Sequence, residues 1–257
     1  MELDTLPQRL IIVGGGYIGL EFAAMYANYG SMVTVLEYGT DFLPREDRDI
    51  ANVIQTRLEA LGIRLVFNAQ VEEITDENDQ TTVGYLDRSS GDHVTLPADA
   101  VLIATGRKAS TAELDLEAAG VKMNERGEII VNELLQTNVP HIWALGDVKG
   151  GLQFTYISLD DSRIIKDQLW GDGKRTATNR GPIPYSMFLD PVFARVGLNE
   201  TEALQAGHKI KVAKIAEAAS PRARLFGSTS GYLKAIVDAD SNKILGDITV
   251  ERILLAH

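Results

Sequence analysis

The stretch RLIIVGGGYIGLEFAAMYANYGSMVTVLE, residues 9–37, decides the fold of this chain. It contains an apolar strand at Leu10–Val13, a glycine-rich turn, a helix, a second strand at Met32–Leu36 and the acidic residue Glu37. A dinucleotide-binding βαβ unit needs these parts in this order. We therefore predict an α/β fold built on a doubly wound, Rossmann-like parallel sheet.

Three glycines and one glutamate in this stretch are candidate cofactor-binding residues. Gly14 allows the tight turn, Gly16 lets a pyrophosphate approach the backbone, and Gly19 lets the helix pack closely on the strand. The helix N-terminus offers unpaired N–H groups and the positive end of its dipole to phosphates. Glu37 follows the glycines by about 20 residues, where a carboxylate accepts hydrogen bonds from both ribose hydroxyls of an adenosine. The pattern predicts a site for NAD(H).

The same acidic residue disfavours NADP(H), because a 2′-phosphate would lie against the Glu37 carboxylate. The nearest following arginine, Arg45, is not adjacent to it. A glycine-rich loop without a ligand is the alternative, since GxGxxG alone is a weak signal. The flanking strands, the helix and the spacing of the acidic residue favour the dinucleotide site.

Composition excludes several other classes of protein. The 257 residues allow two or three domains, and 45% hydrophobic with 24% charged residues is ordinary for a globular protein. A net charge of −11 repels phosphate backbones and anionic membranes, so we expect no nucleic-acid or membrane partner. No apolar run approaches the roughly 18 residues of a membrane span. The start, Met1–Asp4, lacks the basic residues of a signal peptide, so we expect a cytoplasmic protein.

Cysteine is absent, which excludes disulfides, thiolate metal sites and a cysteine nucleophile within these residues. The four histidines lie far apart without the spacing of metal ligands. We therefore expect no metal site.

After residue 37 the pattern continues the same sheet. Glu46–Gly62 has apolar residues at helical spacing, and Ile63–Phe67 is a third apolar strand, which completes a βαβαβ half. Short strand-like segments separated by polar turns then predict an antiparallel meander, and Ala100–Ala104 returns to the parallel sheet. The meander segments are Val71–Thr75, Thr81–Leu86 and His93–Leu96.

The next segment ends in two candidate ligand-binding residues. Thr137–Asp147 is interpreted as an apolar strand that ends in Gly146 and Asp147, at the carboxyl end where open α/β sheets bind ligands. A structural helix cap is the alternative role for Asp147. A helix at Ile157–Leu169 and a linker at Gly171–Gly181 are expected to follow.

From Gly181 onward the pattern is rich in strands and poor in helices. Asn199, with Glu202 three residues later, has the pattern of a capping box at the start of a short helix. A polar turn at Asp240–Asn242 joins the last two strand-like segments. The expected strands are Lys209–Ala216, Tyr232–Asp238 and a last one that begins with Ile244–Gly246.

Five separated segments carry a family resemblance. They are GGGYIGLEFA at 14–23, VTVLE at 33–37, ATGR at 104–107, TNVPHIWALGD at 137–147 and DPVFARVGLNETEA at 190–203, with the weaker KILG at 243–246. Together they resemble the pyridine nucleotide–disulfide oxidoreductase family of flavoproteins, which includes glutathione reductase, dihydrolipoamide dehydrogenase and mercuric reductase. The segments occur in the family's order and span nearly the whole chain.

The resemblance implies three parts. Residues 1–106 would form an NAD(H)-binding domain, residues 107–180 a returning FAD-domain segment, and residues 181–257 a truncated α+β dimerisation domain. The family's upstream GxGxxG helix, its redox-active CxxxxC pair and its terminal His-Pro…Glu pair are absent from the sequence. We therefore assign no catalytic residue and expect the isolated chain to be inactive. We also expect it to self-associate as a homodimer or by edge pairing, with disorder after Gly246 as the alternative.

The resemblance also implies roles for individual residues toward NAD(H). Gly14, Gly16 and Gly19 would hold the pyrophosphate and Glu37 the adenosine ribose. Tyr17 matches an aromatic residue that covers the nicotinamide pocket in related reductases. Val71 would lie near the adenine, and Gly106 would lie at the crossover between domains.

Toward FAD, Glu21 matches a glutamate that pairs with a lysine on the cysteine-bearing helix, which is absent here. Ordinary helix positions that face core and solvent are the alternative for Tyr17 and Glu21. Gly146 and Asp147 would contact the ribityl chain, and Phe154 would lie beside the flavin ring.

The leading hypothesis is that the chain is part of an FAD-dependent NADH oxidoreductase that passes hydride through the flavin to a disulfide or a related acceptor. The segment QFTYISLDD, residues 153–161, resembles the bacterial subgroup linked to resistance against reactive chlorine and hypothiocyanous acid. A non-catalytic NAD-binding and dimerisation module is the alternative. A flavin-free NAD dehydrogenase is a third possibility, for which no catalytic constellation is visible.

Overall fold

A computed structural model describes residues 3–77, 80–225, 227 and 231–251. The chain divides into two compact units. The first consists of Met1–Gly106 and Pro184–His257, and the second of Arg107–Ile183. Each unit is described by itself. In the described part of the chain, no helix is both long and apolar enough to cross a membrane.

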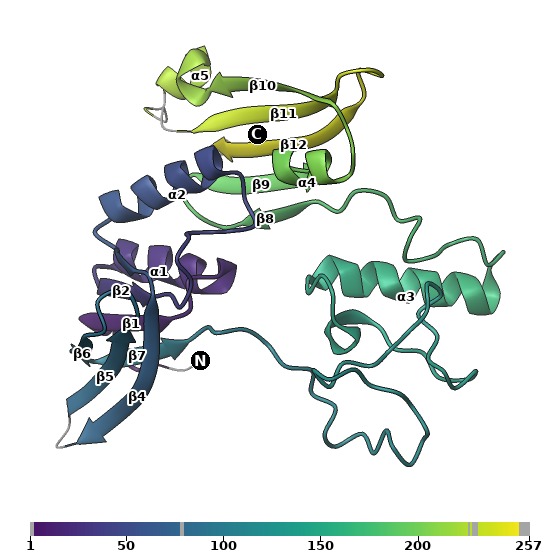
Figure 1. Cartoon of the computed structure of the whole chain (residues 1–257), viewed down its shortest axis with the longest axis horizontal. Helices are drawn as coiled ribbons and strands as arrows, with labels where there is room; N and C mark the ends of the chain where they lie inside the picture. The colour runs from purple at the N-terminus through teal and green to yellow at the C-terminus, as the bar shows by residue number, and fades with distance from the viewer. Residues whose placement is uncertain (1–2, 78–79, 226, 228–230, 252–257) are drawn as a thin grey trace. The chain divides into compact units, whose positions relative to one another are not determined.

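The first unit begins with the predicted parallel sheet, whose strands lie in the order β3-β2-β1-β7. Figure 1 labels β2, β1 and β7 of this sheet. All neighbouring strands pair in parallel. Apart from Arg9, every residue of β1 is buried, as expected of a strand covered on both faces. The elements are β1 (Arg9–Val13), α1 (Tyr17–Tyr29), β2 (Met32–Leu36), α2 (Arg48–Ala60), β3 (Arg64–Val66) and β7 (Ala100–Ile103). The βαβαβ prediction is confirmed.

An antiparallel meander lies against this sheet, as predicted. Alternate residues of β1 point to opposite faces, so Ile11 joins a core with Val83 and Tyr85 of the meander, while Leu10 and Ile12 face the helices. The meander strands, in the order β4-β5-β6, are β4 (Ala69–Glu77), β5 (Gln80–Asp87) and β6 (His93–Ala98).

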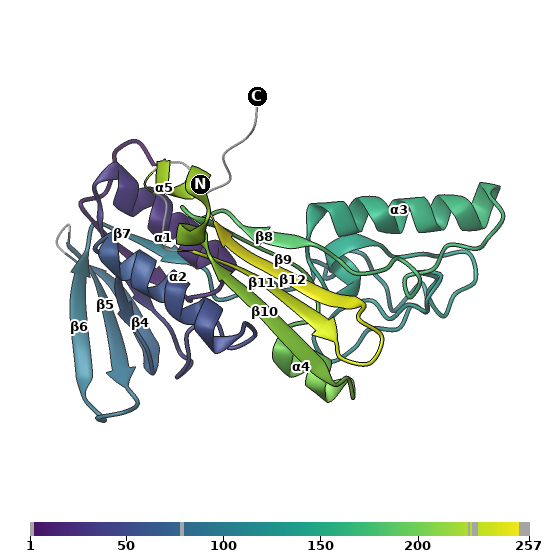
Figure 2. The ribbon, with the colours of Figure 1, turned by 90° about the horizontal axis from the view of Figure 1, so that it is seen from above.

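The C-terminal part of the first unit is a five-stranded antiparallel sheet in the order β10-β11-β12-β9-β8 (Figure 2). The predicted capping box of Asn199 and Glu202 is present at the start of α4. The strands are β8 (Tyr185–Met187), β9 (Val192–Gly197), β10 (Ile210–Ala216), β11 (Tyr232–Asp238) and β12 (Ile244–Glu251). The helices are α4 (Glu200–Gln205), η2 (Glu217–Ala219) and α5 (Pro221–Leu225).

The last strand corrects one sequence expectation. Disorder after Gly246 is wrong as far as Glu251, because β12 pairs with β11 and β9 along its length. Residues 252–257 lie outside the described part of the chain.

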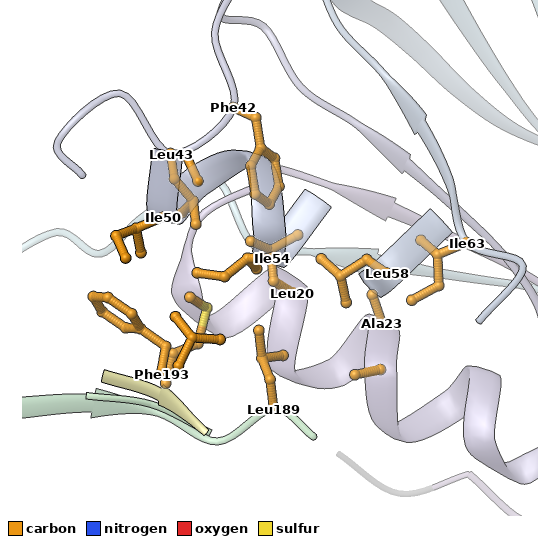
Figure 3. Close-up of a cluster of buried hydrophobic side chains, with 14 of the residues drawn as sticks. Leu20, Ala23, Phe42, Leu43, Ile50, Ile54, Leu58, Ile63, Leu189 and Phe193 are labelled. Carbon is orange, nitrogen blue, oxygen red and sulfur yellow. The ribbon is translucent and has the colours of Figure 1, made fainter. Parts of the chain in front are cut away.

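One hydrophobic core joins the five-stranded sheet to helices α1 and α2. Figure 3 shows Leu20 of α1 and Ile54 of α2 pointing toward Phe193 of β9, and Phe193 is fully buried. Because burial of a phenylalanine side chain contributes about 2–3 kcal/mol, such contacts fix the sheet on the helices. The sheet and the glycine-rich turn are therefore parts of one packed body.

The second unit contains two helices, η1 (Gly146–Lys149) and α3 (Thr155–Trp170). The helix expected at Ile157–Leu169 is confirmed. The strand expected within Thr137–Asp147 is wrong: this segment forms only an isolated bridge between Gln136 and Trp143. Local turns fold this segment back on itself, and the Thr137 amide donates a hydrogen bond to the Ile142 carbonyl. A strand would instead need a second extended segment to pair with.

Candidate functional site

The glycine-rich turn has the geometry that its sequence predicts. Gly14 adopts φ +106°, and a Cβ there would stand 2.5 Å from the Ala104 carbonyl oxygen. A Cβ on Gly19 would collide with the Gly14 carbonyl oxygen. At Gly16, in contrast, no protein atom lies within 4 Å of the Cβ position. Two of the glycines are thus required by packing, while the third leaves open space beside the backbone.

The start of α1 can accept an anion. Gly16 is its N-cap and makes no side-chain capping bond, and its first turn contains no acidic residue. The positive end of the helix dipole is therefore not compensated by a side chain of its own turn. A pyrophosphate fits this position in charge and in space.

Glu37 lies beside the turn at the carboxyl end of β2. Its Oε2 accepts a hydrogen bond from the Gly15 amide at 2.6 Å, and its Oε1 accepts one from the Gly39 amide at 2.7 Å. Each carboxylate oxygen retains a second lone pair, which can accept a hydroxyl. The residues present therefore fit an adenosine ribose next to a pyrophosphate, as NAD(H) requires.

Two further candidates occupy the same N-terminal segment. Val71 lies in β4 opposite Tyr85 and packs, half-buried, against the meander core. Gly106 is the last residue before the second unit begins. Their roles toward a ligand stay predictions.

Tyr17, the first residue of α1, contacts the five-stranded sheet. Its hydroxyl donates to Oε1 of Glu46, and its ring stacks on Tyr185 with centroids 5.8 Å apart and planes 17° apart. The Tyr185 hydroxyl donates to the same Glu46 oxygen at 2.7 Å. Phe193 closes the cluster, with its ring centroid 5.9 Å from that of Tyr185.

Charge compensation for Glu46 comes from Arg195, whose Nη1 lies 3.3 Å from Oε2. Glu46 is 3% exposed and Arg195 5%, so water screens this pair weakly. Burial, and then the Glu46 carboxylate, raise the pKa of the Tyr17 phenol above its ordinary value. The same two causes raise the pKa of Tyr185 to about 12. Both tyrosines are therefore neutral hydrogen-bond donors at neutral pH.

A second charge cluster includes Asp47, the residue that follows Glu46 in the chain. Lys234 of β11 is 1% exposed and donates to Asp47 at 2.8 Å, to Asp49 at 3.0 Å, and to Glu200. Burial alone would lower the pKa of Lys234, but the three carboxylates outweigh it and raise that pKa. The Lys234 ammonium group is the cation that these three carboxylates share.

Glu21 has a partner other than the lysine of the family pattern. Its Oε1 accepts a hydrogen bond from the Phe188 amide at 2.9 Å, in the loop that follows β8. In this structure, Glu21 thus fixes the backbone of the C-terminal sheet against α1.

In the second unit, Gly146 and Asp147 form the first turn of η1. The Asp147 carboxylate pairs with Arg107 at 2.7 Å, and Arg107 also donates to the Gln153 carbonyl at 2.7 Å. Phe154 precedes α3, and its ring stacks on Tyr156 with centroids 5.3 Å apart. Arg107 therefore links Asp147 to Gln153, the residue before Phe154, within this unit, whereas Glu21 lies in the first unit.

Buried Asp161 of α3 supports the η1 turn. Its Oδ2 accepts from the Gly146 amide at 2.9 Å, and its carboxylate pairs with Lys149 and Arg180 at 3.3 and 2.6 Å. The single GxGxxG motif of the sequence, at residues 14–19, lies in the first unit, so the second unit has no such glycine-rich turn.

Sequence reasoning missed Glu46, Tyr185, Arg195 and Asp161. Glu46 was assigned only to the start of a helix, within the charged run Arg45–Asp49, and such runs are usually solvated. Two of the partners of Glu46, Tyr185 and Arg195, lie more than 100 residues from it in the chain. No local pattern indicates such a contact.

Two known family models match this chain. A family model described as "Pyridine nucleotide-disulphide oxidoreductase" matches residues 1–162. A second, "Pyridine nucleotide-disulphide oxidoreductase, dimerisation domain", matches residues 183–250.

Individual relatives match nearly the whole chain. "Probable pyridine nucleotide-disulfide oxidoreductase RclA" of Escherichia coli (strain K12) is 50% identical over 246 residues, which cover 96% of this chain and 54% of that protein. "Mercuric reductase" of Staphylococcus aureus is 35% identical, with 96% and 44% covered. The chain thus spans about half the length of these relatives.

Among solved structures, "HOCl-induced flavoprotein disulfide reductase RclA from Escherichia coli" matches with a TM-score of 0.90 at 49% identity. The match covers 98% of this chain and 56% of that one. The comparison also confirms the predicted fold class.

Proposed function

The chain belongs to the pyridine nucleotide-disulphide oxidoreductase family, and we propose that it supplies the NADH-binding and dimerisation parts of a flavoprotein reductase. In the complete protein, NADH and FAD would supply the redox chemistry, a hydride transfer whose electrons reduce a disulfide or a related acceptor. The residues of this chain would bind the dinucleotide and fix its orientation. Residues 1–106 would form the NAD(H) domain, 107–180 the returning FAD segment and 181–257 the dimerisation domain.

The joint geometry of the glycine-rich turn and Glu37 carries this proposal. Gly16 leaves space at an uncapped helix N-terminus, and Glu37 lies against the next amide of the same turn. A pyrophosphate and a ribose diol need these two features side by side. The carboxylate favours NADH over NADPH, because a 2′-phosphate would meet its negative charge.

Titration calorimetry of the 257-residue chain with NADH and with NADPH tests the site. We expect measurable binding of NADH and weaker binding of NADPH. Equal affinity for both would contradict the role of Glu37, and no binding of either would contradict the site.

Binding of FAD to the isolated chain should be poor. Asp147 and the η1 turn can contact a ribityl chain, but the phosphates would lack a glycine-rich helix start. We propose that the isolated chain has no disulfide reductase activity. A purified chain that carries stoichiometric flavin, visible as a yellow absorbance, would contradict this proposal.

Residues 181–257 are proposed to form a homodimer interface in the cytoplasm, where the family resemblance would place the complete enzyme. The match to the dimerisation-domain model supports this role. The reactive-chlorine subgroup is the proposed physiological context, supported by the 50% identity to the Escherichia coli protein RclA. Its structural counterpart is described as HOCl-induced.

A non-catalytic NAD-binding and dimerisation module remains the second candidate. The sequence carries both parts that such a module needs, the glycine-rich turn and the match to the dimerisation-domain model. Sequencing the coding region upstream separates the two candidates. A continuous reading frame with a second GxGxxG and a CxxxxC pair supports the reductase, whereas a stop codon directly upstream supports the module.

A further inference from the structure

Glu46 links two distant parts of the first unit. We propose that Glu46 is a positioning residue that ties the first turn of α1, where the phosphates of the dinucleotide would lie, to the five-stranded sheet. This inference rests on the proposed NADH site. The affinity of that site for NADH would then depend on the buried Glu46 carboxylate, which lies outside the glycine-rich turn. It would also depend on Tyr185 and Arg195, which lie in the part that matches the dimerisation-domain model.

Tyr17 is the residue through which the link reaches the turn. It follows Gly16 directly and is the first residue of α1. Gly16 makes no side-chain capping bond, so contacts of the first turn's side chains add to the backbone bond from the Leu20 amide to the Gly16 carbonyl. For Tyr17 these contacts are the hydrogen bond to Glu46 and the stack on Tyr185.

The Glu46 carboxylate holds its donors in place. It is almost fully buried, its Oε1 accepts from both tyrosine hydroxyls, and its Oε2 faces Arg195. A buried carboxylate is costly unless its donors stay in contact with it. Tyr17 cannot leave the cluster without removing one of them.

The link has a consequence for ligand binding. A helix N-terminus binds phosphate best when its amides are already in position, because ordering them on binding costs affinity. Tyr185 and Arg195 belong to β8 and β9, so the order of the glycine-rich turn depends on the docking of that sheet.

The neighbouring residue provides a matched control. Asp47 is 7% exposed, adjoins Glu46 in sequence and also binds the five-stranded sheet through Lys234 of β11, besides accepting from the Glu200 amide of α4. These contacts of Asp47 do not involve α1. Glu46→Gln and Asp47→Asn therefore both weaken a polar link to the sheet, but only Glu46→Gln weakens the link to the turn.

The experiment measures the NADH dissociation constant of the 257-residue chain and its variants, with circular dichroism to verify folding. We expect Glu46→Gln to weaken binding about two- to tenfold, the range for loss of one hydrogen bond, and Asp47→Asn to change it less than about twofold. Tyr185→Phe, which removes only a hydroxyl, should weaken binding in the same direction and serves if Glu46→Gln does not fold.

A spectroscopic measurement separates positioning from general loosening. Glu46, Tyr17 and Arg195 face Tyr185, and the Glu46 charge helps to raise the pKa of that phenol to about 12. In Glu46→Gln, absorbance titration should show tyrosine ionising at lower pH than in Asp47→Asn. Unchanged or tighter NADH binding in folded Glu46→Gln and Tyr185→Phe, or equal weakening in Asp47→Asn, would overturn the inference. Failure of the unmodified chain to bind NADH would instead refute the proposed function.

Discussion

The Glu37 carboxylate lies 2.6 Å from the Gly15 amide and accepts its hydrogen bond. The residue expected to select the ribose therefore also braces the turn expected to hold the pyrophosphate. The two halves of the proposed site are connected by this bond. Loss of the carboxylate should affect both.

Glu37→Ala should weaken NADH binding by about 1.5–3 kcal/mol, the cost of losing hydrogen bonds to a charged acceptor. Glu37→Gln keeps an acceptor oxygen and should lose less affinity for NADH than Glu37→Ala. The ratio of NADH affinity to NADPH affinity should fall in Glu37→Gln, because the negative charge is gone. Calorimetry with both dinucleotides measures these effects. Unchanged selectivity in Glu37→Gln would speak against an electrostatic basis.

Two glycines of the same motif should respond differently to alanine. A Cβ on Gly19 would collide with the Gly14 carbonyl, so Gly19→Ala should cost about 1–3 kcal/mol of unfolding free energy. Gly16→Ala adds a methyl group into open space at an ordinary negative φ, so stability should be nearly unchanged. NADH affinity should nonetheless fall, because the methyl group occupies the approach of the pyrophosphate. Thermal unfolding and calorimetry measure the two effects, and equal destabilisation would show that Gly16 is a packing residue.

The sequence predicted elements whose signals are local. The apolar strand β1 and the capping box of Asn199 are local signals of this kind, and the structure contains both. Glu37 likewise lies beside the glycine-rich turn, as its spacing predicts. The strand expected in Thr137–Asp147 failed because apolar residues alone do not provide a pairing partner. The Glu46 cluster could not be predicted, because burial of a charged residue depends on distant donors.

Lys234 should be essential for docking of the five-stranded sheet. Its removal leaves Asp47, Asp49 and Glu200 together without their shared cation, and breaking such a buried cluster costs about 3–5 kcal/mol. Lys234→Met should therefore unfold at much lower urea concentration. Lys214→Met is the control, since Lys214 pairs with Asp49 at a partly exposed position and should cost less than about 1 kcal/mol.

The same cluster predicts the acid limb of the stability curve. Partial burial alone would raise the pKa of Asp49, but hydrogen bonds from Lys214 and Lys234 hold it below its ordinary value. A depressed pKa contributes stability above the unfolded value of about 3.9, and this contribution is lost as pH falls through the folded value. Asp49→Asn should therefore show a shallower loss of stability below about pH 4 than the unmodified chain. Parallel acid limbs in urea titrations would contradict this.

Self-association should use the outer face of the five-stranded sheet. Ile236, Ile248 and Phe193 are fully buried on the inner face, whereas Leu233 and Ile215, which pair directly, are exposed to 36% and 59%. An exposed apolar sheet face in a chain matched by a dimerisation-domain model is expected to pack against a second copy.

Leu233→Lys should place a charge in the middle of that face and shift the chain toward the monomer without unfolding it, because the side chain is already partly solvated. Ile74→Lys is the matched control: Ile74 is 45% exposed, but on β4 of the meander, and this substitution should leave association unchanged. Light scattering at several concentrations measures both. A monomeric unmodified chain would show that residues 181–257 do not suffice for association, and equal effects of the two substitutions would place the interface elsewhere.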